Sequence, residues 1–293
     1  MHESWFAHFS ESPDVLKSAA CERTIVRVHG IEIGGGGFTT MAGPCSVETE
    51  FQLIATARHV RRGGASILRG GAFKPRSSPY SFQGLGLEGL KMLARAREES
   101  GLAIVTEVMS ECDVPMVADY ADILQIGARN MENDSLLQAA ARTGKPILLK
   151  RGMMATVADL LRAAQRVLDE GNPNVILCER GIRTFETATR NTFDVTAIVL
   201  LKQISHLPVI ADPSHAAGHR ELVPALARIA AAAEADGLLV EVHPNPEKAW
   251  SDGEQSLDFA EFDRMMSSLE PLLALRTNAA CEPWSARAME AAG

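Results

Sequence analysis

The sequence predicts a (β/α)8, or TIM, barrel that carries a short β-hairpin ahead of its first strand. Short runs rich in Ile, Val and Leu alternate with longer amphipathic stretches, and eight such pairs follow one another over roughly 240 residues. The short runs are apolar throughout, which is typical of parallel strands that are buried on both faces. A closed barrel commonly uses about 250 residues as one domain. An open doubly wound sheet is the alternative architecture.

The predicted elements alternate along the chain. Apolar runs predict strands at Thr39–Ala42, Ser66–Arg69, Ala103–Glu107, Ile123–Ile126, Ile147–Lys150, Val175–Cys178, Val209–Ala211 and Leu238–Val242. Apolar residues at helical spacing predict helices at Glu50–Arg62, Glu88–Glu99, Cys112–Ala118, Asp134–Thr143, Val157–Glu170, Ala188–Gln203, Glu221–Glu234 and Asp258–Leu275.

The segments outside the barrel are short. Thr24–Val28 and Ile31–Ile33 flank His29-Gly30 and predict a hairpin that would plug the bottom of the barrel. Residues 1–22 are expected to form a loose or helical arm. We therefore divide the chain into an arm with a hairpin at 1–37, the barrel at 38–275 and a flexible tail at 276–293.

The composition limits which binding partners and which cellular compartment are expected for the protein. The 293 residues carry a net charge of −8, which argues against nucleic acid or an anionic membrane as the main partner. The five cysteines are odd in number and widely spaced, so a disulfide framework is not expected and a reducing cytoplasm fits. The first 18 residues do not resemble a signal peptide, and no apolar run approaches the roughly 20 residues that span a bilayer.

Charged residues follow the predicted strands. In a (β/α)8 barrel the chemistry lies at the carboxyl ends of the strands, and all eight predicted ends carry charged or metal-binding groups. Because the protein is acidic overall, basic residues gathered at one rim predict a ligand with more than one phosphate or carboxylate group. The basic residues expected to converge are Arg69, Lys74, Arg76, Arg129, Lys150 and Arg180.

Four potential metal ligands follow the first, seventh and eighth predicted strands. These strands are neighbours in a closed barrel, so Cys45, His215, Glu241 and Asp252 would share one arc of the rim. A thiol, an imidazole and two carboxylates suit Mn²⁺, Fe²⁺, Co²⁺ or Zn²⁺ better than Mg²⁺ or Ca²⁺. A single cysteine after a strand is more often buried filler, but the four together favour a metal site. His243 shares the strand face of Glu241 and is either an outer partner or packing.

Eight ordered motifs extend this interpretation. They read AGPCS at 42–46, LRGGAFKPRSSPY at 68–80, QIGARN at 125–130, LKRG at 149–152, CERGIRT at 178–184, DPSH at 212–215, EVHP at 241–244 and SDG at 251–253. Together they resemble the type I-beta 3-deoxy-D-arabino-heptulosonate 7-phosphate (DAHP) synthase family, over about residues 24–270. The resemblance implies a cytoplasmic homodimer or homotetramer that condenses phosphoenolpyruvate with D-erythrose 4-phosphate.

The resemblance also implies roles for individual residues. The divalent metal would be bound by Cys45, His215, Glu241 and Asp252. Phosphoenolpyruvate would be held by Arg69, Lys74, Ala128, Arg129, Lys150 and Arg180, and erythrose 4-phosphate by Lys74, Pro75, Arg76 and Ser77. Glu107 would help to position the attacking water, and the catalytic set would comprise Lys74, Glu107, Lys150 and His215.

Three other functions are weighed against this one. The related 3-deoxy-D-manno-octulosonate 8-phosphate synthases typically read Lys-Ala-Asn-Arg-Ser-Ser where this chain has Lys74-Pro75-Arg76-Ser77-Ser78. The Pro-Arg pair favours the shorter, four-carbon sugar, and a synthase that uses another aldose phosphate is a further alternative. A non-catalytic regulatory homologue would have lost a metal ligand or a catalytic lysine, and this chain keeps them.

Overall fold

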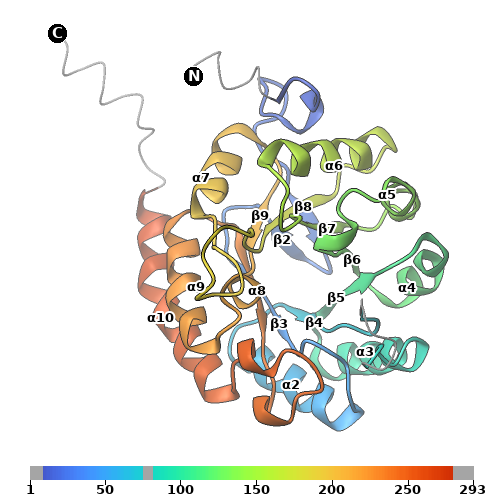
Figure 1. Ribbon diagram of the computed structural model, residues 1–293, viewed down its shortest axis with the longest axis vertical. Helices are drawn as coiled ribbons and strands as arrows, with labels where there is room; N and C mark the ends of the chain where they lie inside the picture. The colour runs from blue at the N-terminus through green and yellow to red at the C-terminus, as the bar shows by residue number, and fades with distance from the viewer. Residues whose placement is uncertain (1–8, 75–81, 280–293) are drawn as a thin grey trace.

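The computed structural model describes residues 9–74 and 82–279, with side chains as far as residue 276, and these residues contain a closed barrel of eight parallel strands. The strands follow the order β10-β3-β4-β5-β6-β7-β8-β9, and Figure 1 shows the helices as a ring around them. Each predicted strand is found, with its ends within one residue of those expected. The strands are β3 (Thr39–Gly43), β4 (Ile67–Arg69), β5 (Ala103–Val108), β6 (Ile123–Ile126), β7 (Ile147–Lys150), β8 (Val175–Glu179), β9 (Val209–Ala211) and β10 (Gly237–Glu241).

The helices pack on the outside of the barrel, and several of them begin at residues with capping side chains. Thr49 accepts a hydrogen bond from the backbone of Gln52 at the start of α2, and Thr156 forms a capping box with Asp159 at the start of α6. The helices are α2 (Glu50–Arg62), α3 (Leu87–Ser100), α4 (Val114–Tyr120), α5 (Asp134–Arg142), α6 (Val157–Asp169), α7 (Val195–Ile204), α8 (Pro213–Ala217), α9 (Val223–Ala232) and α10 (Phe259–Ala279). α10 runs past its predicted end at Leu275, and α8 was not predicted.

The prediction of a helix from Ala188 was wrong for its first seven residues, because α7 begins only at Val195. The preceding residues hydrogen-bond to α8 and to the start of their own loop instead. Arg190 N donates to Ala217 O at 3.1 Å, and Thr192 N donates to Ile182 O at 2.9 Å. The Thr- and Asn-rich stretch 187–192 suits such a loop, since short polar side chains compete with helical hydrogen bonds. The consequence is that Arg190 lies at the rim of the barrel.

The N-terminal hairpin closes the amino ends of the barrel strands, as predicted. β1 (Val26–Val28) pairs with β2 (Ile31–Ile33) in an antiparallel register. Val26, Val28 and Ile33 pack in one buried cluster with residues that point into the barrel, including Met41, Ile67, Val105 and Ile123. His29 Nε2 lies 2.9 Å from Asp122 Oδ1, just before β6 begins. The hairpin therefore fills the lower end of the barrel.

The arm before the hairpin is docked rather than loose where the structure describes it. It contains one turn of 3-10 helix, Pro13–Val15, and Val15 is fully buried. The Ser205 hydroxyl donates to Val15 O at 2.7 Å, which ties the arm to the end of α7. Among the described helices, none is both long and apolar enough to cross a membrane.

Candidate active site and metal centre

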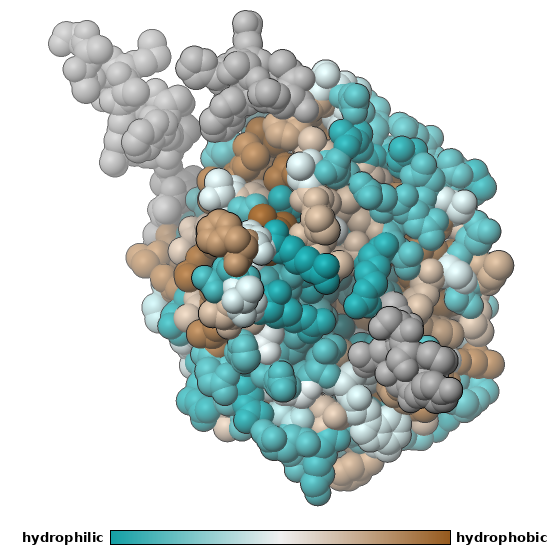
Figure 2. All heavy atoms as spheres, in the orientation of Figure 1, coloured by the Kyte–Doolittle hydropathy of each residue, from teal (hydrophilic) through white to brown (hydrophobic). Residues whose placement is uncertain are grey.

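A polar cavity of about 100 Å³ lies at the carboxyl ends of the strands. Figure 2 shows hydrophilic side chains gathered at the middle of this face. The cavity brings together the predicted residues Arg69, Lys74, Glu107, Ala128, Arg129, Lys150, Arg180, His215 and Asp252. The remaining residues predicted for the second substrate, Pro75, Arg76 and Ser77, lie outside the described part of the chain.

Arg180 is the least satisfied cation of this cavity. Its side chain is buried, burial lowers the pKa of its guanidinium, and no described carboxylate lies within ion-pair distance of it. The Nε atoms of Arg180 and Arg69 are buried and have no hydrogen-bond partner. A buried guanidinium in this state costs desolvation energy that a bound anion would offset. The cavity is therefore suited to an anionic ligand.

Asp212 links the cations of the cavity to the predicted metal ligand His215. Asp212 Oδ2 lies 2.5 Å from Lys150 Nζ and 2.8 Å from His215 Nδ1. Burial opposes ionisation, but the neighbouring His215 and Lys150 hold the pKa of the Asp212 carboxyl well below its usual range. Burial lowers the pKa of His215. A neutral imidazole that donates Nδ1–H to Asp212 keeps the lone pair of Nε2 for a metal.

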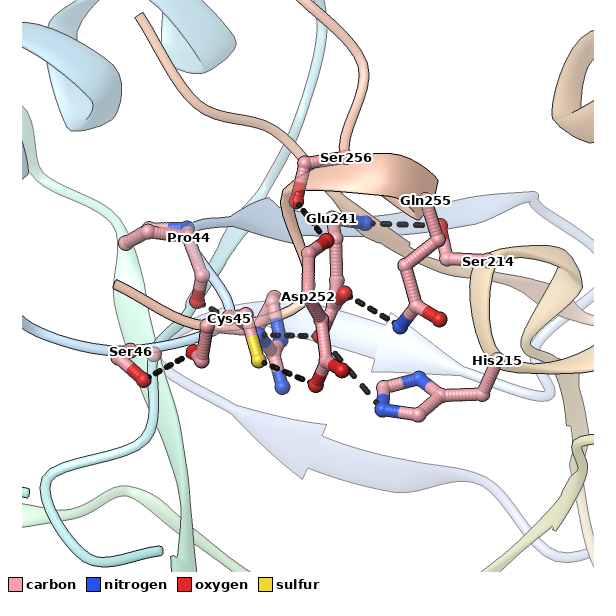
Figure 3. A network of polar contacts seen from close by, with 12 residues as sticks. Pro44, Cys45, Ser46, Ser214, His215, Glu241, Asp252, Gln255 and Ser256 are labelled. Carbon is pink, nitrogen blue, oxygen red and sulfur yellow. Dashed lines mark hydrogen bonds and ion pairs between the residues drawn. The ribbon is translucent and has the colours of Figure 1, made fainter. Parts of the chain in front are cut away.

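The four predicted metal ligands face one another (Figure 3). Cys45 Sγ and one carboxylate oxygen each of Glu241 and Asp252 lie within 4.8 Å of one another. His215 stands at the edge of this group, with Nε2 3.5 Å from Glu241 Oε1. Burial, then the charge of Glu241, raises the pKa of the Cys45 thiol to about 12, and a bound cation would reverse that shift. This donor set fits a divalent transition metal.

A second set of contacts fixes the loop that follows β10. Glu48 Oε2 lies 3.2 Å from His243 Nε2, and Glu48 Oε1 accepts a hydrogen bond from Trp250 N at 2.7 Å. The hydroxyls of Ser46 and Ser251 also hydrogen-bond to each other. His243 thus contacts Glu48 rather than a metal ligand, and it helps to join the segment after Cys45 to the loop that carries Asp252.

Comparison with known proteins follows this geometry. The sequence model of the DAHP synthetase I family matches residues 18–274. The chain belongs to the DAHP synthetase I family. A Thermotoga maritima relative named phospho-2-dehydro-3-deoxyheptonate aldolase is 52% identical over 251 residues, which cover 86% of this chain and 74% of the relative. An Acidithiobacillus ferrooxidans protein named 2-dehydro-3-deoxyphosphooctonate aldolase is 33% identical over 264 residues, 84% of this chain and 93% of its own.

Solved structures agree with the membership of the DAHP synthetase I family. The crystal structure of the Thermotoga maritima phospho-2-dehydro-3-deoxyheptonate aldolase (DAHP synthase) superposes with a TM-score of 0.85 at 51% identity, covering 87% of this chain and 75% of that one. A truncated form of 3-deoxy-D-arabino-heptulosonate 7-phosphate synthase from Thermotoga maritima also gives 0.85, at 46% identity, covering 91% of this chain and 98% of that one.

Sequence reasoning missed several residues of this DAHP synthetase site. Gln125 lines the cavity, and its Nε2 lies 3.3 Å from Glu107 Oε2. A Cβ on Gly127 would lie 2.0 Å from Glu107 Oε1, so this glycine leaves the space that the carboxylate occupies. Arg190 lines the cavity as well, and it was hidden by the wrong helix prediction. The period-2 alternation of a strand could have identified Gln125, which points the same way as Ile123 inside the barrel.

Proposed function

We propose that this chain is a 3-deoxy-7-phosphoheptulonate synthase, which condenses phosphoenolpyruvate with D-erythrose 4-phosphate to give DAHP and phosphate at the entry to the shikimate pathway. The observation that carries the proposal is the buried, unpaired Arg180 in a cationic cavity that opens beside the Cys45, Glu241 and Asp252 cluster. An anion site and an electrophile site next to each other suit the joining of an enol phosphate to an aldehyde. Family membership and the Thermotoga relative support the same reaction.

The reaction balances with residues of this cavity. The C3 carbon of phosphoenolpyruvate forms a bond to the aldehyde carbon, and the aldehyde oxygen takes up a proton. Water adds at C2, where positive charge develops, and phosphate leaves as its carbon–oxygen bond breaks. One proton of the water leaves with the phosphate, and the other replaces the proton that the aldehyde oxygen took up. We assign the binding of phosphoenolpyruvate to Arg69, Lys74, Arg129, Lys150 and Arg180 with the backbone of Ala128. When bound by Cys45, His215, Glu241 and Asp252, a divalent metal supplies an electrophile for the aldehyde oxygen.

Lys74 is proposed to supply a proton, and Glu107 is proposed to orient the attacking water. Lys74 lines the cavity with Nζ 2.9 Å from Cys45 Sγ, so its ammonium is near the place where the alkoxide forms. We assign to Lys74 the proton that the alkoxide receives. Glu107, on β5, lines the same cavity and accepts from Gln125, and we assign to it the orientation of the water that adds at C2. Lys150 and His215 complete the catalytic set through their shared contact with Asp212.

The choice of aldehyde is the finer part of the proposal. We assign erythrose 4-phosphate to Lys74 together with Pro75, Arg76 and Ser77. The identity of 52% to the heptonate aldolase, against 33% to the octonate aldolase, favours the four-carbon sugar. Arabinose 5-phosphate, as for an octulosonate synthase, is the second candidate because those relatives match nearly as much of this chain.

The test follows the loss of phosphoenolpyruvate by the purified protein. Erythrose 4-phosphate and arabinose 5-phosphate are supplied separately, each with and without EDTA and then with added Mn²⁺. Turnover with erythrose 4-phosphate alone, abolished by EDTA and restored by Mn²⁺, is the expected result. Turnover only with arabinose 5-phosphate would replace the aldehyde assignment. No turnover with either sugar in metal-replete protein would overturn the proposed function and favour a non-catalytic homologue.

We also propose a cytoplasmic enzyme that assembles as a homodimer or homotetramer. The described cysteines Cys21, Cys45, Cys112 and Cys178 are all free, which supports a reducing compartment. The assembly follows from the family resemblance, and light scattering coupled to size exclusion would measure it. A mass near 31.5 kDa in solution would contradict it.

A further inference from the structure

The two carboxylates of the candidate metal centre share one arrangement. Each has one oxygen turned toward the other donors and one oxygen held from outside. Asp252 Oδ2 lies 3.1 Å from Cys45 Sγ, whereas Asp252 Oδ1 accepts from Arg190 Nη1 at 3.3 Å. Glu241 Oε1 faces His215 Nε2 at 3.5 Å and accepts from Arg69 Nη1 at 3.2 Å, whereas Glu241 Oε2 accepts from Gln255 Nε2 at 2.6 Å. The outer oxygens are thus tied to two residues that are not themselves metal ligands.

Arg190 and Gln255 also contact each other. Arg190 Nη1 donates to Gln255 Oε1 at 2.7 Å, so a continuous chain runs from Asp252 through Arg190 and Gln255 to Glu241. Gln255 is buried, and its amide must present oxygen to the guanidinium and nitrogen to the carboxylate. Figure 3 shows this amide directed at Glu241. The orientation of each carboxylate therefore depends on the other through two intermediate side chains.

The backbone around Arg190 holds it in this place. Its amide donates to Ala217 O at 3.1 Å, at the end of the short helix that carries His215. Gly218 has a φ of +73°, and a Cβ there would lie 2.5 Å from the Cβ of Arg190. Glycine at this position therefore permits the left-handed turn and leaves room for Arg190. Arg190 also lines the substrate cavity, on the same loop as Arg180.

We propose that Arg190 and Gln255 are positioning residues that fix the two carboxylate ligands of the metal centre. Arg190 additionally connects that centre to the β8–α7 loop, which carries Arg180. This inference rests on the proposed metal centre of the synthase. Outer partners of metal ligands are commonly worth about 10- to 100-fold in metal affinity, because they hold the ligand atoms in their binding orientation.

The test measures metal affinity separately from turnover. Arg190→Met and Gln255→Met remove the hydrogen bonds and keep side-chain length, and the double variant tests whether the two act as one unit. EDTA-stripped protein is titrated with Mn²⁺ and Zn²⁺ in competition with a chromophoric chelator. We expect each single variant to bind Mn²⁺ and Zn²⁺ about 10- to 100-fold more weakly than the wild type. The double variant should bind them about as weakly as the more affected single variant, because the two residues act as one unit. Arg190→Lys should recover part of the loss, since it restores one cationic donor.

Two controls separate positioning from general damage and from substrate binding. Arg183→Met removes an exposed arginine of the same loop, whose side chain has no hydrogen bond or ion pair to a described residue, and should leave metal affinity unchanged. Gln255 does not line the substrate cavity, so Gln255→Met should leave phosphoenolpyruvate affinity of the metal-free protein unchanged. Circular dichroism of the metal-free variants should show that each is folded at the temperature of the titrations, so that weaker metal binding does not reflect unfolding.

Three results would overturn the inference. Metal affinities within about twofold of wild type in both single variants would show that the carboxylates need no outer partner. An equal loss in Arg183→Met would assign the effect to loop charge. A loss of phosphoenolpyruvate affinity with metal affinity intact would make Arg190 a substrate ligand instead. If the wild-type protein itself bound neither metal, the proposed metal centre would be refuted. That outcome differs from one in which the wild type binds metal normally and the variants bind it equally well, which would refute only the positioning roles.

Discussion

The two sides of the barrel mouth differ in how far their polar side chains are hydrogen-bonded. Over β9, β10 and β3, the polar side chains are paired with one another, in a chain from Asp212 through His215, Glu241 and Gln255 to Arg190. Over β4 and β8, the Nε atoms of Arg69 and Arg180 are buried without a partner. The metal side is organised by the protein, whereas the anion side still has donors to satisfy.

The difference indicates which side depends on its ligand. Buried donors that lack partners cost stability and are compensated only when an anion arrives. Paired carboxylates and imidazole keep their geometry without the ligand, which is the preorganisation that a metal centre requires. Asp212 is one contact between the two sides, because the same oxygen accepts from Lys150 and from His215. Two further contacts join them: Arg69 Nη1 lies 3.2 Å from Glu241 Oε1, and Lys74 Nζ lies 2.9 Å from Cys45 Sγ.

The largest expected effect comes from the metal side. Cys45→Ser replaces the thiol donor, and turnover should fall by more than about 1,000-fold because the electrophile contributes several kcal/mol to the transition state. Phosphoenolpyruvate affinity, measured by calorimetry on metal-free protein, should stay within about threefold, since its arginines are untouched. Turnover within tenfold of wild type in Mn²⁺ would exclude Cys45 as a necessary ligand.

On the anion side, Arg180→Met should lower kcat/KM for phosphoenolpyruvate by about 30- to 1,000-fold. This corresponds to about 2–4 kcal/mol for a lost charged hydrogen bond. The ligand-free variant should melt no lower than wild type, because an unpaired buried cation is replaced by an apolar chain. A marked drop in melting temperature would contradict the distinction between the two sides.

Asp212→Asn tests one contact between the sides. Asp212 Oδ1 accepts from His215 N at 2.9 Å, while Oδ2 faces Lys150 Nζ and His215 Nδ1. An amide has only one oxygen and cannot accept at both positions, so we expect phosphoenolpyruvate and Mn²⁺ each to bind about 10- to 100-fold more weakly. Titrations of each ligand in the absence of the other would measure both effects. If only one affinity changed, this contact would not couple the two sides. Circular dichroism before the titrations checks that the variant is folded, since one partner of a buried pair has been altered.

The smallest effect is expected from Gly127→Ala. Its new Cβ would lie 2.0 Å from Glu107 Oε1 and force the carboxylate aside, so kcat should fall by about tenfold while both ligand affinities persist. Gly127 has a φ of −67°, so alanine introduces no backbone strain there. Gly37→Ala is the matched control, because no atom lies within 4 Å of the added Cβ. An unchanged kcat in Gly127→Ala would remove Glu107 from the reaction.

The barrel was predictable because the strands are distinct, largely apolar runs, each with polar residues at or soon after its carboxyl end. Lys150 and Glu241 illustrate this, since the same position ends the strand and reaches the rim. The start of α7 was not predictable from periodicity. Ala188–Asp194 has residues compatible with a helix, but its hydrogen bonds go to Ala216, Ala217 and Ile182, which are contacts that only the closed barrel creates.

The candidate site was predicted best where residue type reveals chemistry. Cys45 and His215 drew attention together, because a thiol and an imidazole that follow the two strands flanking β10 can share one metal ion with the carboxylates of that arc. Gln255 and Asp212 were missed as site residues because they touch ligands only through other side chains, and that relation exists only in three dimensions. Arg190 was missed for two reasons. It lies on the loop that was wrongly predicted as a helix, and it contacts the metal ligand Asp252 rather than the metal itself.

The hairpin at the bottom of the barrel determines where ligands enter and leave. Because Val28 and Ile33 fill the lower end, ligands exchange with solvent through the upper rim. Two substrates must enter there and two products must leave by the same way. In the proposed reaction the phosphate is released in the same cavity that Arg180 lines. Because both products leave through the rim that admits both substrates, the entry of a new substrate competes with the departure of the last product.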